Sequence, residues 1–193
     1  MRRIPAGFYW HPCRLSASVA SPRPEHCDEL RETPIMRIAL YQPDIPQNTG
    51  TILRLCACLG IEAHIIAPAG FPTSDRAFRR AGMDYLDTVA LVRHSSWQAF
   101  EAWRRAQNQR LLLFTTAATQ SYLDYAYRPN DVLLFGRESA GVPQEVHDCA
   151  DARLRIPMQP GLRSLNVALA AAMAAGEALR QTGGMPANHD LPA

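Results

Sequence analysis

Residues 43–55, PDIPQNTGTILRL, gather polar side chains at the point where an expected helix begins. The free backbone N–H groups of a first helical turn attract phosphate or another anion. Asn48 stands at this helix start, and Arg54 follows six residues later, off the same helical face. Arg54 either acts on a ligand lying across the helix start or is an ordinary solvated arginine. Its neighbours Leu53 and Leu55 favour the first interpretation, because leucine would serve a core better at position 54.

A second segment, LLFGRESAGVP at residues 133–143, presents one carboxylate in a glycine-rich turn. Its apolar run is typical of a buried strand, and Pro143 is typical of a helix start. Gly136 and Gly141 permit a positive φ angle or a close approach of a ligand to the backbone. Glu138 lies between these glycines, where it either arranges a binding site or caps the following helix.

The third segment, residues 155–166, joins a strand to the last long helix. The strand is expected to end at Ile156, a Pro-Gly loop follows, and Ser164 is the expected cap of an alanine-rich helix. Asn166 closes the sequence RSLN at this helix start. Alanine lets another element approach a helix closely, although its strong helix propensity explains the composition equally well.

These segments must be positioned by an alternation of strands and helices. Continuous apolar strands separated by helices predict a parallel sheet with helices on both faces. Ligands in such folds bind beyond the carboxyl ends of the strands, which places residues 114–116, 136–138 and 156–158 on one rim. The expected strands are 37–41, 63–67, 87–92, 110–116, 131–136 and 152–158, and the expected helices are 46–59, 75–82, 95–107 and 165–181.

The composition excludes several kinds of chemistry. All twenty basic residues of the 193-residue chain are arginine, which excludes a Schiff-base lysine and a P-loop lysine. The five cysteines form no Cys-x-x-Cys pair and the histidines lack metal-ligand spacing, so we expect no metal site. A reducing cytoplasm fits free cysteines best. No apolar stretch approaches the roughly 18 residues that span a bilayer, so we expect no membrane association.

The two ends of the chain differ from its middle. Residues 1–35 hold five prolines and no sustained periodicity, so we expect a disordered extension or a start codon assigned upstream of a true start at Met36. Prolines and charges interrupt the stretch after Met1, which argues against a secretory signal. We expect one domain over residues 36–182 and a loose tail over residues 183–193.

The order of the three segments carries a resemblance. N-x-G-x-x-x-R, then F-G-x-E-x-x-G-x-P, then I-P-M followed by R-S-L-N resembles the three motifs of the SPOUT class of RNA methyltransferases. Within that class, LYQPDIPQNTGTILRL, RRAGMDY at 79–85 and RIPM look like the tRNA wobble-nucleotide 2′-O-ribose methyltransferases. The resemblance covers about residues 36–182.

The resemblance implies a fold, a cofactor and an assembly. The C-terminal part of the parallel sheet would be tied in a deep trefoil knot, an exception to the usual absence of knots. S-adenosylmethionine would be held by the knot loops, through Phe114, Gly136, Ile156 and Ser164. The enzyme would be a homodimer with its active site at the subunit boundary. It would methylate the ribose 2′-hydroxyl of the wobble cytidine or uridine in the tRNA anticodon loop, without a metal.

The resemblance also implies roles for the motif residues. Arg54 would hold the adjacent phosphate and stabilise the developing alkoxide rather than act as a simple base, because a guanidinium stays protonated. Asn48 and Glu138 would position Arg54 or the ribose, and Asn166 would shape the cofactor loop.

The anticodon stem-loop would need local positive charge, because the net charge is only +2. Arg76, Arg79 and Arg80 fall at helical spacing on one face, and Arg93 with His94 would extend this patch. An ordinary solvated face explains the same spacing.

Two other functions are weaker. A dinucleotide-binding module would need G-x-G-x-x-G after the first strand, where this chain has QPDIPQNTG. A catalytically silent relative is disfavoured because Arg54, Glu138, Ser164 and Asn166 are all present.

Overall fold

Short apolar runs and helical segments alternate along the chain, and the computed structural model describes them over residues 36–80 and 86–187. The expectations for residues 1–35, and for the tail beyond residue 187, lie outside the described residues. The strands are β1 (Arg37–Tyr41), β2 (Glu62–Ile66), β3 (Leu91–His94), β4 (Leu111–Phe114), β5 (Gln120–Ser121), β6 (Val132–Phe135) and β7 (Ala152–Arg155). The helices are α1 (Pro46–Leu59), α2 (Asp75–Arg80), α3 (Trp97–Ala106), α4 (Gln144–Cys149) and α5 (Val167–Thr182), with a 3₁₀ turn at Tyr122–Asp124.

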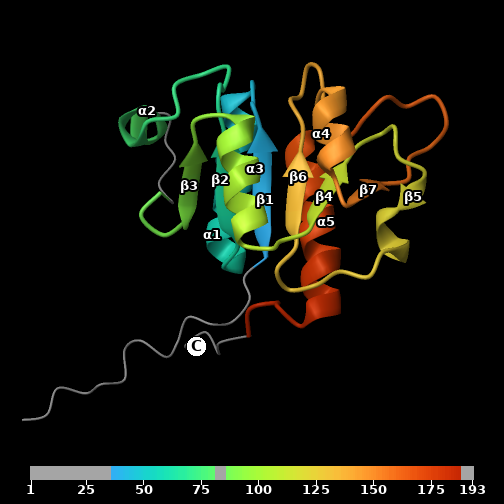
Figure 1. The fold of residues 1–193 in the computed structure, drawn as a ribbon. Helices are drawn as coiled ribbons and strands as arrows, with labels where there is room; N and C mark the ends of the chain where they lie inside the picture. The colour runs from blue at the N-terminus through green and yellow to red at the C-terminus, as the bar shows by residue number, and fades with distance from the viewer. Residues whose placement is uncertain (1–35, 81–85, 188–193) are drawn as a thin grey trace, which may run out of the picture. The chain divides into compact units, whose positions relative to one another are not determined.

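The strands of the described chain form one sheet in the order β3-β2-β1-β6-β4-β7-β5, and every pairing is parallel (Figure 1). The predicted parallel sheet is therefore confirmed. The order places β6 beside β1, with Arg37 opposite Val132 and Leu40 opposite Phe135. The segments that follow β1, β4, β6 and β7 consequently reach the same edge of the sheet.

Both faces of the sheet are covered, because successive side chains of each strand alternate between them. In β1, Ile38 and Leu40 pack into the core beneath α1 and α5, whereas Ala39 and Tyr41 belong to the core beneath α3 and α4. Helices on both faces are thus confirmed (Figure 1). None of the described helices is both long and apolar enough to cross a membrane.

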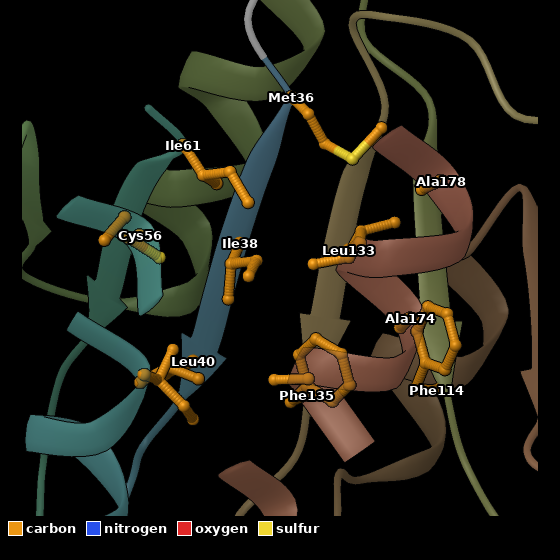
Figure 2. Close-up of a cluster of buried hydrophobic side chains, with 14 of the residues drawn as sticks. Met36, Ile38, Leu40, Cys56, Ile61, Phe114, Leu133, Phe135, Ala174 and Ala178 are labelled. Carbon is orange, nitrogen blue, oxygen red and sulfur yellow. The ribbon is translucent and has the colours of Figure 1, made fainter. Parts of the chain in front are cut away.

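The alanines of α5 bring that helix close to the sheet. Ala171, Ala174, Ala175 and Ala178 are completely buried. Figure 2 shows Ala174 and Ala178 facing the strands that carry Phe114, Leu133 and Phe135. The predicted close approach is confirmed, and Gly183 ends the helix in the left-handed conformation that favours glycine.

Several boundaries differ from the expected ones. β3 runs over Leu91–His94 instead of 87–92, because it forms a strand only where β2 offers a partner, at residues 63–66. β7 ends at Arg155, short of Pro157, which has no N–H to donate to a neighbouring strand. β5, only two residues long, has too little periodicity to be predicted.

Candidate functional site

A cavity of about 420 Å³ opens at the carboxyl ends of β4, β6 and β7. The rim predicted from the three strand ends is confirmed, since Thr115, Gly136 and Met158 all line this cavity. The four predicted cofactor-binding residues also line it, namely Phe114, Gly136, Ile156 and Ser164. The remaining lining residues are Ile45, Asn48, Leu113, Thr116, Phe135, Arg137, Glu138, Gly141, Val142, Leu154, Leu165, Asn166, Val167 and Ala170.

The cavity wall combines apolar strand ends with a polar rim. The rings of Phe114 and Phe135 stack with their centroids 5.0 Å apart, and Leu154 and Ile156 are buried beside them. Hydroxyl, amide, guanidinium and carboxylate groups of the loops stand above this apolar floor. Such a cavity suits a small ligand with one flat apolar part and one polar part.

The turn after β6 requires glycine at its first position. A Cβ atom at Gly136 would lie 2.7 Å from the backbone carbon of Gly141, closer than real contacts allow. Arg137 and Gly141 exchange two backbone hydrogen bonds, of 3.0 and 2.7 Å, and Gly141 has a φ of +68°. The turn therefore closes tightly on itself and carries Glu138 at the cavity wall.

Glu138 ties this turn to the start of α1. Its Oε1 accepts a hydrogen bond from Asn48 Nδ2, and its Oε2 accepts one from the backbone N–H of Asp44, both at 3.1 Å. The alternative that Glu138 caps α4 is wrong, because the N-cap of α4 is Pro143 and receives no side-chain hydrogen bond.

Asn166 extends the connection to α5. Its Nδ2 donates to Asn48 Oδ1 at 2.9 Å, and its Oδ1 accepts from the backbone N–H groups of Ala168 and Leu169. The prediction that Ser164 caps this helix is wrong, because α5 begins at Val167 and Asn166 provides the cap. Three predicted catalytic residues thus form one hydrogen-bonded chain, Glu138–Asn48–Asn166.

Arg54 lies apart from this chain. Its side chain is exposed on α1 and is not among the residues that line the cavity. Ile52, Leu53 and Cys56 are buried beside it, so the turn of the helix explains the apolar neighbours that had favoured a functional role. The catalytic role of Arg54 stays a prediction.

Asp44 was not predicted as a site residue, although it lies in the loop after β1, at the edge of the sheet where ligands bind. The Ser139 hydroxyl donates to Asp44 Oδ2, and Arg137 Nε lies 3.9 Å from the same oxygen. The pKa of Asp44 is lowered, first through its interaction with the neighbouring Glu138 side chain and then through the hydrogen bonds that its carboxylate accepts from Ser139. A carboxylate between a strand end and a helix start was the signal that could have found it.

The predicted arginine patch is only partly described. Arg76 is exposed on α2, whereas the side chains of Arg79 and Arg80 lie outside the described part of the structure. Arg93 is bound to Asp75 at 2.5 Å and to the carbonyl of Thr73. The extension of the patch through His94 is wrong, because that ring is buried and bonded to His64.

Among the described residues, no group of three or more His, Cys, Asp or Glu side chains could hold a metal ion. Cys56 is buried and Cys58 is exposed, because side chains two positions apart on a helix point to different faces.

Comparison with known proteins extends this description. Residues 35–176 match the SpoU rRNA Methylase family. A tRNA (cytidine(34)-2′-O)-methyltransferase of Beijerinckia indica subsp. indica is 65% identical over 155 residues, which are 80% of this chain and 97% of the relative.

Solved structures agree with the sequence comparison. One, described as giving structural insights into the 2-OH methylation of C/U34 on tRNA, is 42% identical with a TM-score of 0.69, over 76% of this chain and 95% of that one. An AdoMet-bound rRNA methyltransferase from Sinorhizobium meliloti is 30% identical with a TM-score of 0.68, over 76% of this chain and 56% of that one.

Proposed function

The chain belongs to the SpoU rRNA methylase family, and from that premise we propose that it methylates the 2′-hydroxyl of nucleotide 34 of tRNA. The methyl donor is S-adenosylmethionine and the accepted nucleotide is cytidine or uridine. One observation carries the proposal: the three segments that resemble wobble-nucleotide methyltransferases converge on a single cavity. The 65% identical relative, itself named a tRNA (cytidine(34)-2′-O)-methyltransferase, supports this substrate.

The cavity fits S-adenosylmethionine in its chemistry. Its floor, with the stacked rings of Phe114 and Phe135, is apolar enough for an adenine ring. The tight turn at Gly136 leaves backbone groups at the wall, and Ile156 and Ser164 also line the cavity. The AdoMet-bound structure of a 30% identical relative supports the same cofactor.

The cofactor would supply an electrophilic methyl group, and this chain's residues supply alignment and stabilisation of charge, while the proton of the ribose hydroxyl passes to solvent. Alignment alone contributes roughly 7–11 kcal/mol in well-oriented reactions. The Glu138–Asn48–Asn166 chain fixes the helix start of α1 and the N-terminus of α5 against one wall of the cavity. Arg54 holds the neighbouring phosphate and stabilises the negative charge that develops as the ribose hydroxyl loses its proton.

The proposed enzyme is a homodimer with its active site at the subunit boundary. Leu165, Leu169 and Met173 are spaced four residues apart on or next to α5, and all are exposed. Leu165 and Ile45 are both exposed and both line the cavity, so an apolar partner surface at its mouth would shield them. Arg54 of a second copy would then act at this cavity. This arrangement would account for the absence of Arg54 from the cavity lining of its own subunit.

Family membership supports two further proposals. The chain after β6 is tied in a deep trefoil knot, whose loops form the cofactor pocket. The methyltransferase domain spans residues 36–182.

The anticodon stem-loop binds to the dimer itself, through Arg76, Arg79 and Arg80. Phosphate contacts release counterions, so affinity for tRNA falls steeply as salt rises. The enzyme acts in the cytoplasm, where tRNA is processed. An affinity that ignores salt would contradict this mode of binding.

The test is transfer of labelled methyl from S-adenosylmethionine to unmodified tRNA, followed by nuclease mapping of the product. The expected label lies on the ribose of nucleotide 34 and is lost in Arg54→Ala, while that variant still binds the cofactor. Label at another nucleotide would overturn the substrate position. No label with bound cofactor, across a broad tRNA pool, would overturn the proposed reaction.

A further inference from the structure

Asp44 contacts three consecutive residues of the turn that carries Glu138. Its backbone N–H donates to Glu138 Oε2 at 3.1 Å. Its Oδ2 accepts the hydroxyl of Ser139 and lies 3.9 Å from Arg137 Nε. No carboxylate other than that of Asp44 is hydrogen-bonded to Ser139 within the described residues. The turn after β6 is therefore bound to the loop after β1 chiefly by Asp44, beside one further hydrogen bond of 3.1 Å from Arg137 Nε to the carbonyl of Gln42.

The segment after β2 holds Asp44 from its other side. The backbone N–H of Gly70 donates to the carbonyl of Pro43 at 2.8 Å. A Cβ atom at Gly70 would lie 2.9 Å from both Cα and Cβ of Asp44, so only glycine allows this approach. Asp44 is consequently fixed between two loops, and a shift of its backbone would have to move one of them.

The carboxylate of Asp44 has one oxygen bound to the turn and one oxygen without a protein partner in the described part of the chain. Oδ1 of Asp44 is buried and has no hydrogen-bond partner among the described residues. A buried acceptor without a partner costs free energy of folding. Residues kept at such a cost are expected where they serve function.

We propose that Asp44 is a positioning residue, which sets the conformation of residues 137–139 and thereby the direction of the Glu138 carboxylate. This inference rests on the proposed function, because Glu138 lies in the wall of the proposed cofactor cavity. With Ser139 bound to Asp44, Glu138 keeps one oxygen on Asn48, whose own oxygen then remains available to Asn166. Without the Asp44 carboxylate the turn loses its contacts at Ser139 and Arg137. The backbone N–H of residue 44 and the carbonyl of Gln42 still bind it, so the Glu138 carboxylate is held less firmly toward Asn48.

The experiment compares four variants for methyl transfer to tRNA, with kcat and KM measured separately. Asp44→Ala is expected to lower kcat about 100-fold with the KM for tRNA unchanged, since a misplacement of about 1 Å has effects of that size. Ser139→Ala removes one hydrogen bond and is expected to lower kcat about 10-fold, a factor that equals about 1.4 kcal/mol. Asp44→Asn retains an oxygen for Ser139 and should restore part of the loss. Asp124→Asn, at an exposed position far along the chain, is the matched control.

A double-mutant cycle separates positioning from general damage. Ser139→Ala should have no further effect in the Asp44→Ala background, because contacts in one network are not additive. A folded Asp44→Ala protein with wild-type kcat would overturn the inference. Additive losses from Asp44 and Ser139 would overturn it as well. If Asp44→Ala does not fold, Ser139→Ala alone decides, and an unchanged kcat contradicts the proposal.

A crystal structure of Asp44→Ala gives a readout that does not depend on activity. The expected result is a displaced Glu138 carboxylate that has left Asn48, in a protein whose sheet is unchanged. Should wild-type protein methylate no tRNA, the proposed function fails while this structure still tests the positioning role. Retention of the Glu138–Asn48 hydrogen bond in the variant would overturn it.

Discussion

Two polar networks on the same sheet have opposite relations to solvent. Beneath α3, Arg37 Nε and His64 Nε2 both contact Glu62 Oε1, at 2.9 and 2.8 Å, and His64 Nδ1 lies 2.9 Å from His94 Nε2. At the carboxyl edge, Glu138, Asn48 and Asn166 form a chain that ends at a cavity. Both networks join a half-buried glutamate to nitrogen donors: Arg37 and His64 at Glu62, and Asn48 with the backbone N–H of Asp44 at Glu138.

Their surroundings make the difference. The His64 ring is completely buried, and its centroid lies 4.4 Å from that of the Trp103 ring. The centroids of the His94 and Phe100 rings are 5.2 Å apart. Aromatic packing on α3 thus closes the histidine network, whose groups bind one another. The network at the cavity uses only half-buried and exposed residues, so its atoms can reach a ligand. Burial, more than residue type, separates a structural network from a candidate site.

The largest expected effect is a loss of stability of the histidine network in acid. Burial, and after it the neighbouring His64, lowers the pKa of His94 to about 4 from its ordinary 6.5. The unfolded chain binds this proton first, so the free energy of unfolding falls as the pH drops from 6.5 to 4, by up to roughly 3 kcal/mol. Hydrogen bonds from His64 and Arg37 lower the pKa of Glu62 to about 2, so a further loss follows between pH 4.5 and 2.

Urea unfolding of the wild type and of His94→Gln at pH 7.5 and 4.5 measures this effect. The variant should show a smaller pH dependence. An equal pH dependence of the unfolding free energy in the two proteins would contradict this prediction, because the His64–His94 pair would then contribute nothing to the loss of stability in acid.

Glu138→Gln is expected to lower kcat about 100-fold, which equals about 2.7 kcal/mol, while the free energy of unfolding changes little. Its amide NH₂ would face either Asn48 Nδ2 or the N–H of Asp44, donor against donor. Glu62→Gln should have the converse effect, a lower stability with kcat retained. Activity assays and denaturant unfolding of both variants check this opposite behaviour. If each variant lost both kcat and stability, the distinction between the two networks would be refuted.

Gly136→Ala is expected to destabilise the fold by about 2 kcal/mol, because its Cβ would overlap the backbone of Gly141. Affinity for S-adenosylmethionine should fall with it, as calorimetry would measure. Gly176→Ala is the matched control: its Cβ meets no atom within 4 Å in α5, and it should stabilise the helix by about 0.5–1 kcal/mol. An unchanged cofactor affinity in Gly136→Ala would show that the turn after β6 takes no part in the cofactor site.

Asn166→Ala is expected to have the smallest effect on stability, about 1 kcal/mol for the loss of a helix cap. Ser96→Ala removes the equivalent cap of α3, where Ser96 accepts from Ala99 at 3.1 Å, and should have the same stability effect. Only Asn166→Ala should also lower kcat, because only Asn166 contacts Asn48. Thermal unfolding and methyl transfer are measured on both variants. An equal kcat in the two would contradict a role for Asn166 in the site beyond helix capping.

Local signals predicted much of the fold. β1 and α1 match their expected bounds, since an apolar run and a proline followed by a helical pattern are properties of neighbouring residues. The rim of the cavity followed from a general rule about parallel sheets, once the strand ends were recognised. The start of α5 was misplaced because both Ser164 and Asn166 are good caps, and only the contact with Asn48 distinguishes them.

Contacts between residues far apart along the chain could not be predicted from the sequence. Asn48 and Glu138 are 90 positions apart, and Asn48 and Asn166 are 118 apart, so no periodicity joins them. The binding of Asp44 to Ser139 depends on β6 lying beside β1, an arrangement that the alternation of elements does not specify. The buried pairing of His64 with His94 likewise required the register of β2 and β3.

The adjacency of β1 and β6 also bears on how the protein folds. β2 joins β1, and β3 joins β2, through crossovers of modest length, whereas β6 reaches β1 only after most of the chain has been placed. Pairings between segments so far apart in sequence form slowly, because the closing of a long loop precedes any gain from contact. The cavity needs residues from both segments, so cofactor binding becomes possible only after this late pairing. Bound S-adenosylmethionine would then favour completely assembled molecules over partly folded ones, by mass action.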